Sequence, residues 1–298
     1  MRRIQSLMTV AAVVLVLGAC GEAAEPVATV TFEPNPMVLP YPGYLAAHLQ
    51  WEVTAPLGPS ESNPLVFVHI LDEEGNVVRT FDHPLPFDWQ PGTSHDYEVI
   101  LYQSALAPPL DNGEYRLSLG LYDPSGQRWA LCCLGDEIDD FEYQAATVSV
   151  NGKADEVPMF YFSPSWLPLE AGTDVQVLGR RWLTDEGSIR IAEIPSQGSV
   201  WMRLRLPNPA TEVEELALME GEAEPLVRVG GTCSAEEITV RGLGFHEIKV
   251  PVDANEEGEI PTECEILLQP NFYILEVDTL DRRSLALEIL SWSGASGL

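Results

Sequence analysis

The feature that most constrains the fold of this chain is a period-two alternation of apolar and other residues between closely spaced turn residues. Every second residue from Tyr115 to Leu121 is large and apolar, and residues 49–53 alternate in the same way. Successive side chains of a strand point to opposite faces, so these segments predict strands with one buried face. The 24 prolines and 23 glycines fall among such segments, and no long amphipathic run carries a helix-capping pattern. The pattern predicts an all-β fold of antiparallel sandwiches.

The length of the chain indicates two domains. Its 298 residues exceed one typical sandwich, and an apolar share of 45% is enough for two cores. A polar, glycine-bearing stretch separates two strand-like regions, and we place the linker there, over residues 151–158. We therefore predict tandem immunoglobulin-like or jelly-roll-like antiparallel sandwiches at residues 27–150 and 159–293, with a flexible tail at 294–298.

One strand and its hairpin can be placed within the first domain. Leu65–Leu71 is apolar on both faces apart from His69, which is typical of a central strand. Residues 72–76 are typical of a turn, and Val77–Asp82 is predicted to form the second strand of a hairpin. His69 and Asp82 would then be neighbours and suggest an acid–base pair. A strand histidine hydrogen-bonded within a hairpin is the favoured interpretation, because no nucleophile accompanies the two residues.

The N-terminus resembles a bacterial lipoprotein signal. A positive start is followed by an apolar run over residues 10–17 and by small residues leading to Cys20. The run is shorter than the roughly 20 residues of a spanning helix. The resemblance implies cleavage of residues 1–19, a lipid such as palmitate on Cys20, and a polar tether over residues 20–26. An ordinary secretory signal with an incidental cysteine is the alternative, and Gly21 gives no argument for retention in an inner membrane.

The charge of the chain excludes one class of partner. Without residues 1–19, 14 basic residues face 46 acidic ones, a net charge of −32. Phosphate backbones and anionic headgroups are bound through Lys and Arg, and the chain has two lysines, Lys153 and Lys249. We expect no nucleic-acid partner and attachment to the membrane through lipid alone. The acidity itself can reflect either a function or a saline habitat.

Four cysteines remain once Cys20 carries lipid, and an extracytoplasmic compartment favours disulfides. Cys233 and Cys264 lie in one predicted domain, and we favour a disulfide between them. Cys132 and Cys133 are then left as a strained vicinal pair or as free thiols, since adjacent side chains of a strand point to opposite faces. The other two pairings of the four cysteines would join the domains to each other.

Several motifs of the first domain occur in one order and spacing over about 65 residues. They are Phe67-Val68-His69-Ile70-Leu71-Asp72-Glu73-Glu74-Gly75, Asp82 and Pro84, Trp89-Gln90-Pro91-Gly92, Gly113-Glu114-Tyr115, Gly120-Leu121-Tyr122-Asp123 and Arg128. Together they resemble a β-sandwich module of bacterial envelope proteins that often sits C-terminal to polytopic glycosyltransferases and also occurs in secreted proteins without an enzyme. The second domain resembles the module that commonly follows, through Trp166, Glu170, Arg181-Trp182 and Asp281-Arg282-Arg283-Ser284-Leu285. The resemblance implies no catalytic residues.

One strand of the second domain carries a candidate binding site. Its apolar face is predicted to hold Val200, Met202, Leu204 and Leu206, and its other face Trp201, Arg203 and Arg205. In an acidic protein, two arginines beside a tryptophan suit stacking on a sugar ring or pairing with a carboxylate. The favoured structural alternative is that the arginines pair with neighbouring acids and Trp201 covers the sheet.

Cofactor and enzyme motifs are sparse. Two acidic segments, Asp136–Glu142 and Asp253–Gly258, resemble calcium loops, but solvated charge runs are the commoner explanation, so we expect no cofactor. No cysteine or histidine spacing suits a zinc site, and no metal is predicted. No nucleophile elbow, metalloprotease helix, phosphate loop or dinucleotide fingerprint is present.

We therefore expect a non-enzymatic, lipid-anchored protein of the cell envelope, outside the cytoplasm. Its expected role is binding or assembly, with envelope carbohydrate or a partner envelope protein as the ligand. The carbohydrate part rests on the glycosyltransferase association of the similar module, which is an analogy. The alternatives are a purely structural surface spacer and a glycan hydrolase that uses paired carboxylates, which need no fixed sequence spacing.

Overall fold

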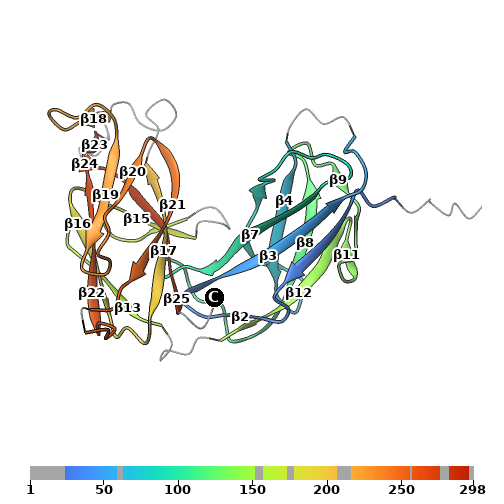
Figure 1. The fold of residues 1–298 in the computed structure, drawn as a ribbon, viewed down its shortest axis with the longest axis horizontal. Helices are drawn as coiled ribbons and strands as arrows, with labels where there is room; N and C mark the ends of the chain where they lie inside the picture. Colours follow the sequence, from blue (N-terminus) through green and yellow to red (C-terminus); the bar gives the residue numbers. More distant parts are fainter. Residues whose placement is uncertain are drawn as a thin grey trace, which may run out of the picture.

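The computed structural model describes residues 24–58, 63–151, 157–172, 178–206, 216–255, 257–275 and 282–294. These residues form strands, turns and loops, and none of them is helical, so the predicted all-β class is confirmed. No helix within the described ranges is long and apolar enough to cross a membrane. Figure 1 shows two β-rich units, one built from the first half of the chain and one from the second.

The first unit contains strands β1 to β12 in two sheets. One sheet has the order β10 (Leu131–Cys132), β1 (Ala28–Glu33), β3 (Gly43–Val53) and β7 (Ser94–Gln103). The other has the order β11 (Glu137–Asp139), β12 (Glu142–Val150), β8 (Gly113–Tyr122), β4 (Leu65–Leu71) and β5 (Val77–Thr80). Three short strands join its members: β2 (Met37–Leu39), β6 (His83–Pro84) and β9 (Arg128–Trp129).

The second unit contains strands β13 to β25. One sheet has the order β13 (Met159–Phe162), β16 (Gly187–Ala192), β22 (Glu263–Pro270), β19 (Leu226–Gly231) and β20 (Ile238–Arg241). The facing sheet has the order β14 (Glu170–Ala171), β15 (Gly179–Trp182), β25 (Ala286–Gly294), β17 (Gly198–Leu206) and β21 (Gly244–Val252). A small third sheet contains β18 (Leu216–Leu218), β23 (Phe272–Leu275) and β24 (Arg282–Arg283). Among the described strands, no sheet combines members of both units.

The apolar residues at every second position of the predicted strands form the core of the first unit. Leu117, Leu119 and Leu121 of β8 are fully buried between the two sheets. Strand β4 lies between β8 and β5, as expected of a central strand, and a turn at residues 72–76 leads into β5. Gly75 has a φ of 88° in that turn, a conformation that favours glycine. Two pairings depart from the antiparallel prediction: β1 with β10 and β2 with β12 are parallel.

The two units are joined by a close interface. The segment after β7 lies against β25: the Ala105 N–H donates to the Leu290 carbonyl at 2.7 Å, and the Leu290 N–H donates to the Ser104 hydroxyl at 3.1 Å. The hydroxyls of Tyr44 and Ser199 lie 2.6 Å apart across the same interface. Trp201 packs with the core of the first unit, and Leu106 packs with the core of the second. Each sandwich therefore contributes a side chain to the hydrophobic core of the other.

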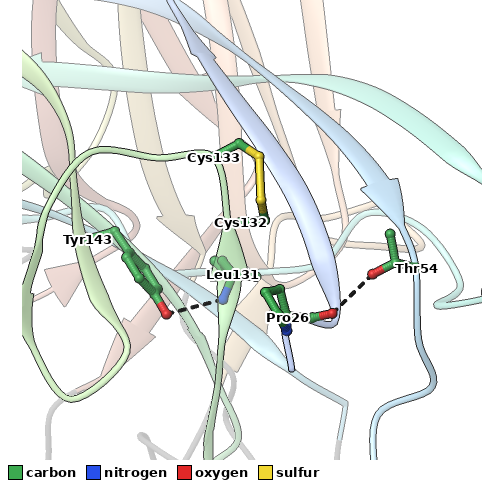
Figure 2. Close-up of a disulfide and its surroundings, with 6 residues drawn as sticks. All are labelled: Pro26, Thr54, Leu131, Cys132, Cys133 and Tyr143. Carbon is green, nitrogen blue, oxygen red and sulfur yellow. Dashed lines mark hydrogen bonds between the residues drawn. A yellow bond between two sulfur atoms is a disulfide. The ribbon is translucent and has the colours of Figure 1, made fainter. Parts of the chain in front are cut away.

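Two pairs of cysteines lie at disulfide distance. Cys233 and Cys264 have a Cα separation of 4.9 Å, in agreement with the favoured pairing. Cys132 and Cys133 form the vicinal pair, one of the two alternatives left open for them. Figure 2 shows this pair following Leu131, whose N–H donates to the Tyr143 hydroxyl at 3.3 Å.

Some of the predictions lie outside the described residues. These are the signal at residues 1–19, lipidation of Cys20, the first part of the tether, most of the linker and the tail from residue 295. On either side of the linker, β12 ends at Val150 and β13 begins at Met159.

Candidate functional site

The predicted trio lies on the outer face of the sheet that contains β17. Cross-strand pairs join Trp201 to Lys249, Arg203 to Glu247 and Arg205 to Phe245 of β21. The opposite face of β17 enters the second core, where Val200, Met202, Leu204 and Leu206 are fully buried. The sequence prediction of which side chains share a face is therefore confirmed.

Trp201 is buried and presents no open ring for stacking, as in the favoured structural alternative. Its ring centroid lies 5.0 Å from that of Tyr102 and 6.1 Å from that of Tyr44, and only 5% of the residue is exposed. The cause is the docking of the first unit, whose strands β3 and β7 supply both tyrosines. Trp201 therefore contributes mainly to the joint between the units, with a part of its side chain reaching a cleft beside them.

Both arginines of the trio are paired with acids, as in the structural alternative. Arg203 donates from Nε at 3.2 Å and from Nη2 at 2.9 Å to Oε1 of Glu247. Arg205 lies 3.6 Å from the buried carboxylate of Glu288. Burial raises the pKa of Glu288, and the charge of Arg205 opposes that shift.

A cleft of about 200 Å³ opens beside Trp201 at the junction of the two units. The first unit contributes aromatic, aliphatic and acidic side chains, and the second contributes three residues. The lining residues are Thr80, Phe81, Asp82, His83, Pro86, Tyr97, Glu98, Val99, Ile100, Tyr102, Trp201, Arg203 and Glu247. The cleft is smaller than the roughly 300–1,000 Å³ of drug-sized sites, so it suits a single small ring or side chain.

The polar groups of the cleft pair with one another, His83 with Tyr97 and Arg203 with Glu247. His83 Nδ1 lies 2.9 Å from the Phe81 carbonyl, which only accepts, so Nδ1 carries the proton and Nε2 accepts from the Tyr97 hydroxyl at 2.9 Å. Burial lowers the pKa of His83 and keeps the ring neutral near pH 7. Three lining carboxylates, Asp82, Glu98 and Glu247, outnumber the single arginine. An anionic ligand is therefore disfavoured.

An exposed aromatic ring lies next along β21. Phe245 is 64% exposed, and the Arg205 guanidinium lies 5.8 Å from its ring centroid. Phe245 and Glu247 are two residues apart on one strand and share a face, a separation of about 7 Å. Phe245 thus lies two residues along the strand from Glu247 of the cleft lining.

A second cluster surrounds His69 on the outer face of β4 and β8. His69 Nε2 lies 3.4 Å from Asp82 Oδ1, and His69 Nδ1 lies 3.5 Å from Glu142 Oε1. The Ser118 hydroxyl donates to Glu142 at 2.5 Å, and the Tyr122 hydroxyl donates to Asp82 at 3.1 Å. Asp82 therefore belongs to both the cluster and the cleft.

Aromatic packing encloses the His69 cluster. Phe67 stacks on the His69 ring with centroids 4.8 Å apart. The Arg128 guanidinium lies 5.1 Å from the centroid of the Phe67 ring. Gly120 makes room for Phe67, because a Cβ at that position would collide with the ring. The Ser118 side chain is fully buried and committed to Glu142. These contacts favour the structural interpretation of His69 over an acid–base pair.

The charges of the cluster fix the protonation of His69. Burial opposes the charged ring, but the carboxylates of Asp82 and Glu142 outweigh it and raise the pKa of His69 to about 9. His69 holds the pKa of Glu142 below its usual value, against the effect of burial. At neutral pH the cluster is therefore a buried imidazolium between two carboxylates.

We expect a stability loss at alkaline pH from this cluster. A raised folded pKa stabilises the protein fully below the unfolded pKa of His69, 6.5, and that stabilisation disappears as pH rises through about 9. The free energy of unfolding should fall by roughly 3 kcal/mol between pH 6 and pH 9. Denaturant unfolding at both pH values measures the loss. A flat profile, or a rise in stability over this range, would contradict a protonated His69.

The motif residues of the second domain also converge. Glu170 accepts from Trp182 Nε1 at 3.0 Å and from Arg283 at 3.2 Å, and Arg283 lies 5.3 Å from the Trp182 ring centroid. Glu170, Trp182 and Arg283 thus join β14, β15 and β24, which is a structural role.

The two acidic segments have structural roles within their loops. Asn255 accepts from the N–H groups of Glu257 and Glu259 at 3.0 and 2.8 Å, and Glu137 accepts from the Phe141 N–H at 2.9 Å. In the described part of the chain, no three His, Cys, Asp or Glu side chains are grouped to hold a metal ion.

Sequence reasoning missed several members of both sites. Glu142 and Ser118 join His69 through the pairing of β8 with β4 and β12, which local patterns do not reveal. His69 and Ser118 occupy opposed positions of neighbouring strands, so strand register was the available signal. The cleft residues His83 and Tyr97 meet Arg203 only because the units dock.

Comparisons with known proteins give no family for this chain. Neither a protein-family model nor a curated protein matches it. Among solved structures, it shares 8% identity and a TM-score of 0.25 with a protein titled pT26-6p, over 90% of this chain and 64% of that one, which is less than two thirds of its length.

Two further structures are similarly distant. The CupB6 tip adhesin from Pseudomonas aeruginosa shares 10% identity, with a TM-score of 0.16, over 87% of this chain and 91% of the adhesin. A type II cohesin dyad from the adaptor ScaA scaffoldin of Acetivibrio cellulolyticus shares 9% identity, with a TM-score of 0.15, over 91% of this chain and 85% of the dyad. Scores this low carry no argument about the function of this chain.

Proposed function

We propose that this protein is a lipid-anchored binding module of the cell envelope that holds a neutral saccharide at the junction of its two sandwiches. The observation that carries the proposal is the cleft of about 200 Å³, whose aromatic and charged walls come from both units. Carboxylates, an arginine and a tyrosine hydroxyl exchange hydrogen bonds with sugar hydroxyls, and aromatic rings pack against the apolar face of the sugar.

The surface has room for more than one saccharide unit. One unit occupies the cleft between Tyr97 and Arg203, and the next lies over the exposed ring of Phe245. The excess of carboxylates at the cleft selects neutral sugars over uronic acids, since a uronate would lie against like charges. Attachment through Cys20 would place this surface outside the cytoplasm, where the two cysteine pairs suit an oxidising compartment.

The experiment uses a glycan array and a pull-down from native envelope membranes. We expect retention of neutral oligosaccharides on the array, with weaker retention of their uronate counterparts. If the pull-down retains a protein and the array retains no glycan, the ligand is a protein and the saccharide proposal is wrong. If neither experiment shows binding, the structural-spacer alternative is supported. Turnover of a bound glycan would instead support the hydrolase alternative.

A further inference from the structure

The two cysteine pairs differ in their access to solvent. Cys233 and Cys264 are 1% and 5% exposed, and they are 31 residues apart in the chain. Cys133 is exposed and Cys132 is half-buried. Within the folded protein, a thiol reagent therefore reaches the vicinal pair and not the distant one.

The two pairs also differ in what they stabilise. A bridge across 31 residues restricts the unfolded chain, whereas a bond between neighbours closes no chain between them. The vicinal pair therefore adds little to global stability. Its effect is local: Cys133 has a φ of 72°, in the left-handed region that is unfavourable for residues with a Cβ. The bond joins this residue to Cys132, which pairs with Thr29 of β1.

The vicinal pair lies where the chain crosses between sheets at the N-terminal end of the first unit. Strand β10 pairs with β1 at two positions, Ala28 with Leu131 and Thr29 with Cys132, and the Val27 N–H donates to the Ala130 carbonyl at 2.9 Å. Figure 2 shows the pair beside the segment that leads from Pro26 into β1. A change of the backbone at Cys133 acts directly on this two-residue pairing.

We propose that Cys132 and Cys133 form a thiol–disulfide exchange site, which an extracytoplasmic dithiol reduces selectively while the Cys233–Cys264 bridge stays intact. A thiolate of the donor attacks Sγ of Cys133, the bond between the two sulfurs breaks, and Cys132 leaves as a thiolate that takes up a proton. The second thiol of the donor displaces Cys133 from the mixed disulfide. The donor becomes a disulfide, and the protein gains two electrons and two protons.

Reduction releases the left-handed turn at Cys133 and loosens β10 from β1. Exposed disulfides are the ones that exchange under mild conditions, whereas buried structural bridges resist reduction. The site thereby couples the redox state outside the cytoplasm to the order of the segment that follows the tether.

The test is a dithiothreitol titration of the full chain in detergent, with free thiols alkylated and located by mass spectrometry. We expect Cys132 and Cys133 to be modified together at a dithiothreitol concentration at least tenfold below that needed for Cys233 and Cys264. The proposal is overturned if both pairs are reduced in one step, if the order is reversed, or if Cys132 and Cys133 are alkylated before any reductant is added.

Amide hydrogen exchange tests the structural consequence. Exchange at residues 27–29 and 130–133 should rise at least fivefold in the selectively reduced protein and in the C132S/C133S variant. The rest of β3 and β8 serves as the internal reference and should not change. Equal exchange in the oxidised and reduced proteins would overturn the coupling to β1.

Discussion

The H69Q variant is expected to unfold with a free energy about 3–5 kcal/mol below that of the wild type at pH 6. Glutamine keeps a polar side chain of similar length but removes the positive charge between Asp82 and Glu142. Two largely buried carboxylates, 24% and 10% exposed, then face each other without a cation. Chemical denaturation monitored by tryptophan fluorescence measures the difference.

His48 provides a matched control for this substitution. It also lies between two carboxylates, 4.0 Å from Asp96 and 3.5 Å from Glu98, but its side chain is 49% exposed. Exposed ion pairs contribute little, so H48Q should change the free energy of unfolding by less than about 1 kcal/mol. Equal losses in H69Q and H48Q would show that burial of the His69 cluster is not the source of the effect.

The W201A variant should lose about 3–5 kcal/mol of unfolding free energy, the range for removal of a buried aromatic side chain. The substitution leaves a cavity against Tyr44 and Tyr102 at the joint of the two units. Thermal and denaturant unfolding of W201A and of the wild type give the difference.

F245A is the control for the loss of an aromatic side chain on the same sheet face. Because Phe245 is 64% exposed, its removal should change the free energy of unfolding by no more than about 0.5 kcal/mol. A W201A protein as stable as the wild type would contradict the docked arrangement of the two sandwiches.

Local patterns in the sequence predict the strands and the faces they bury. The apolar run at Leu65–Leu71, the turn at residues 72–76 and the alternation from Tyr115 to Leu121 each correspond to structure in the expected place. The alternation of β17 likewise predicts which side chains enter the second core. These features depend on neighbours two to five residues apart, and such neighbours are visible in the sequence.

The parts that could not be predicted depend on contacts between distant segments. Local sequence does not show what covers Trp201, because the covering tyrosines lie about 100 residues or more away. Glu142 approaches His69 through two strand pairings, and the parallel pairing of β10 with β1 follows from a crossing between sheets. Neither burial by a second domain nor the register between distant strands produces a pattern in the local sequence.

The central claim, a saccharide surface formed by the cleft and Phe245, is tested most directly by isothermal titration of the best array glycan into F245A and Y161A. Tyr161 is the matched control, because it is 43% exposed and lies 4.4 Å from Arg190 on the opposite sheet of the same unit. We predict that F245A weakens binding at least tenfold, or about 1.4 kcal/mol, while Y161A binds within twofold of the wild type. Unchanged affinity of F245A, or equal losses in both variants, would contradict the claim.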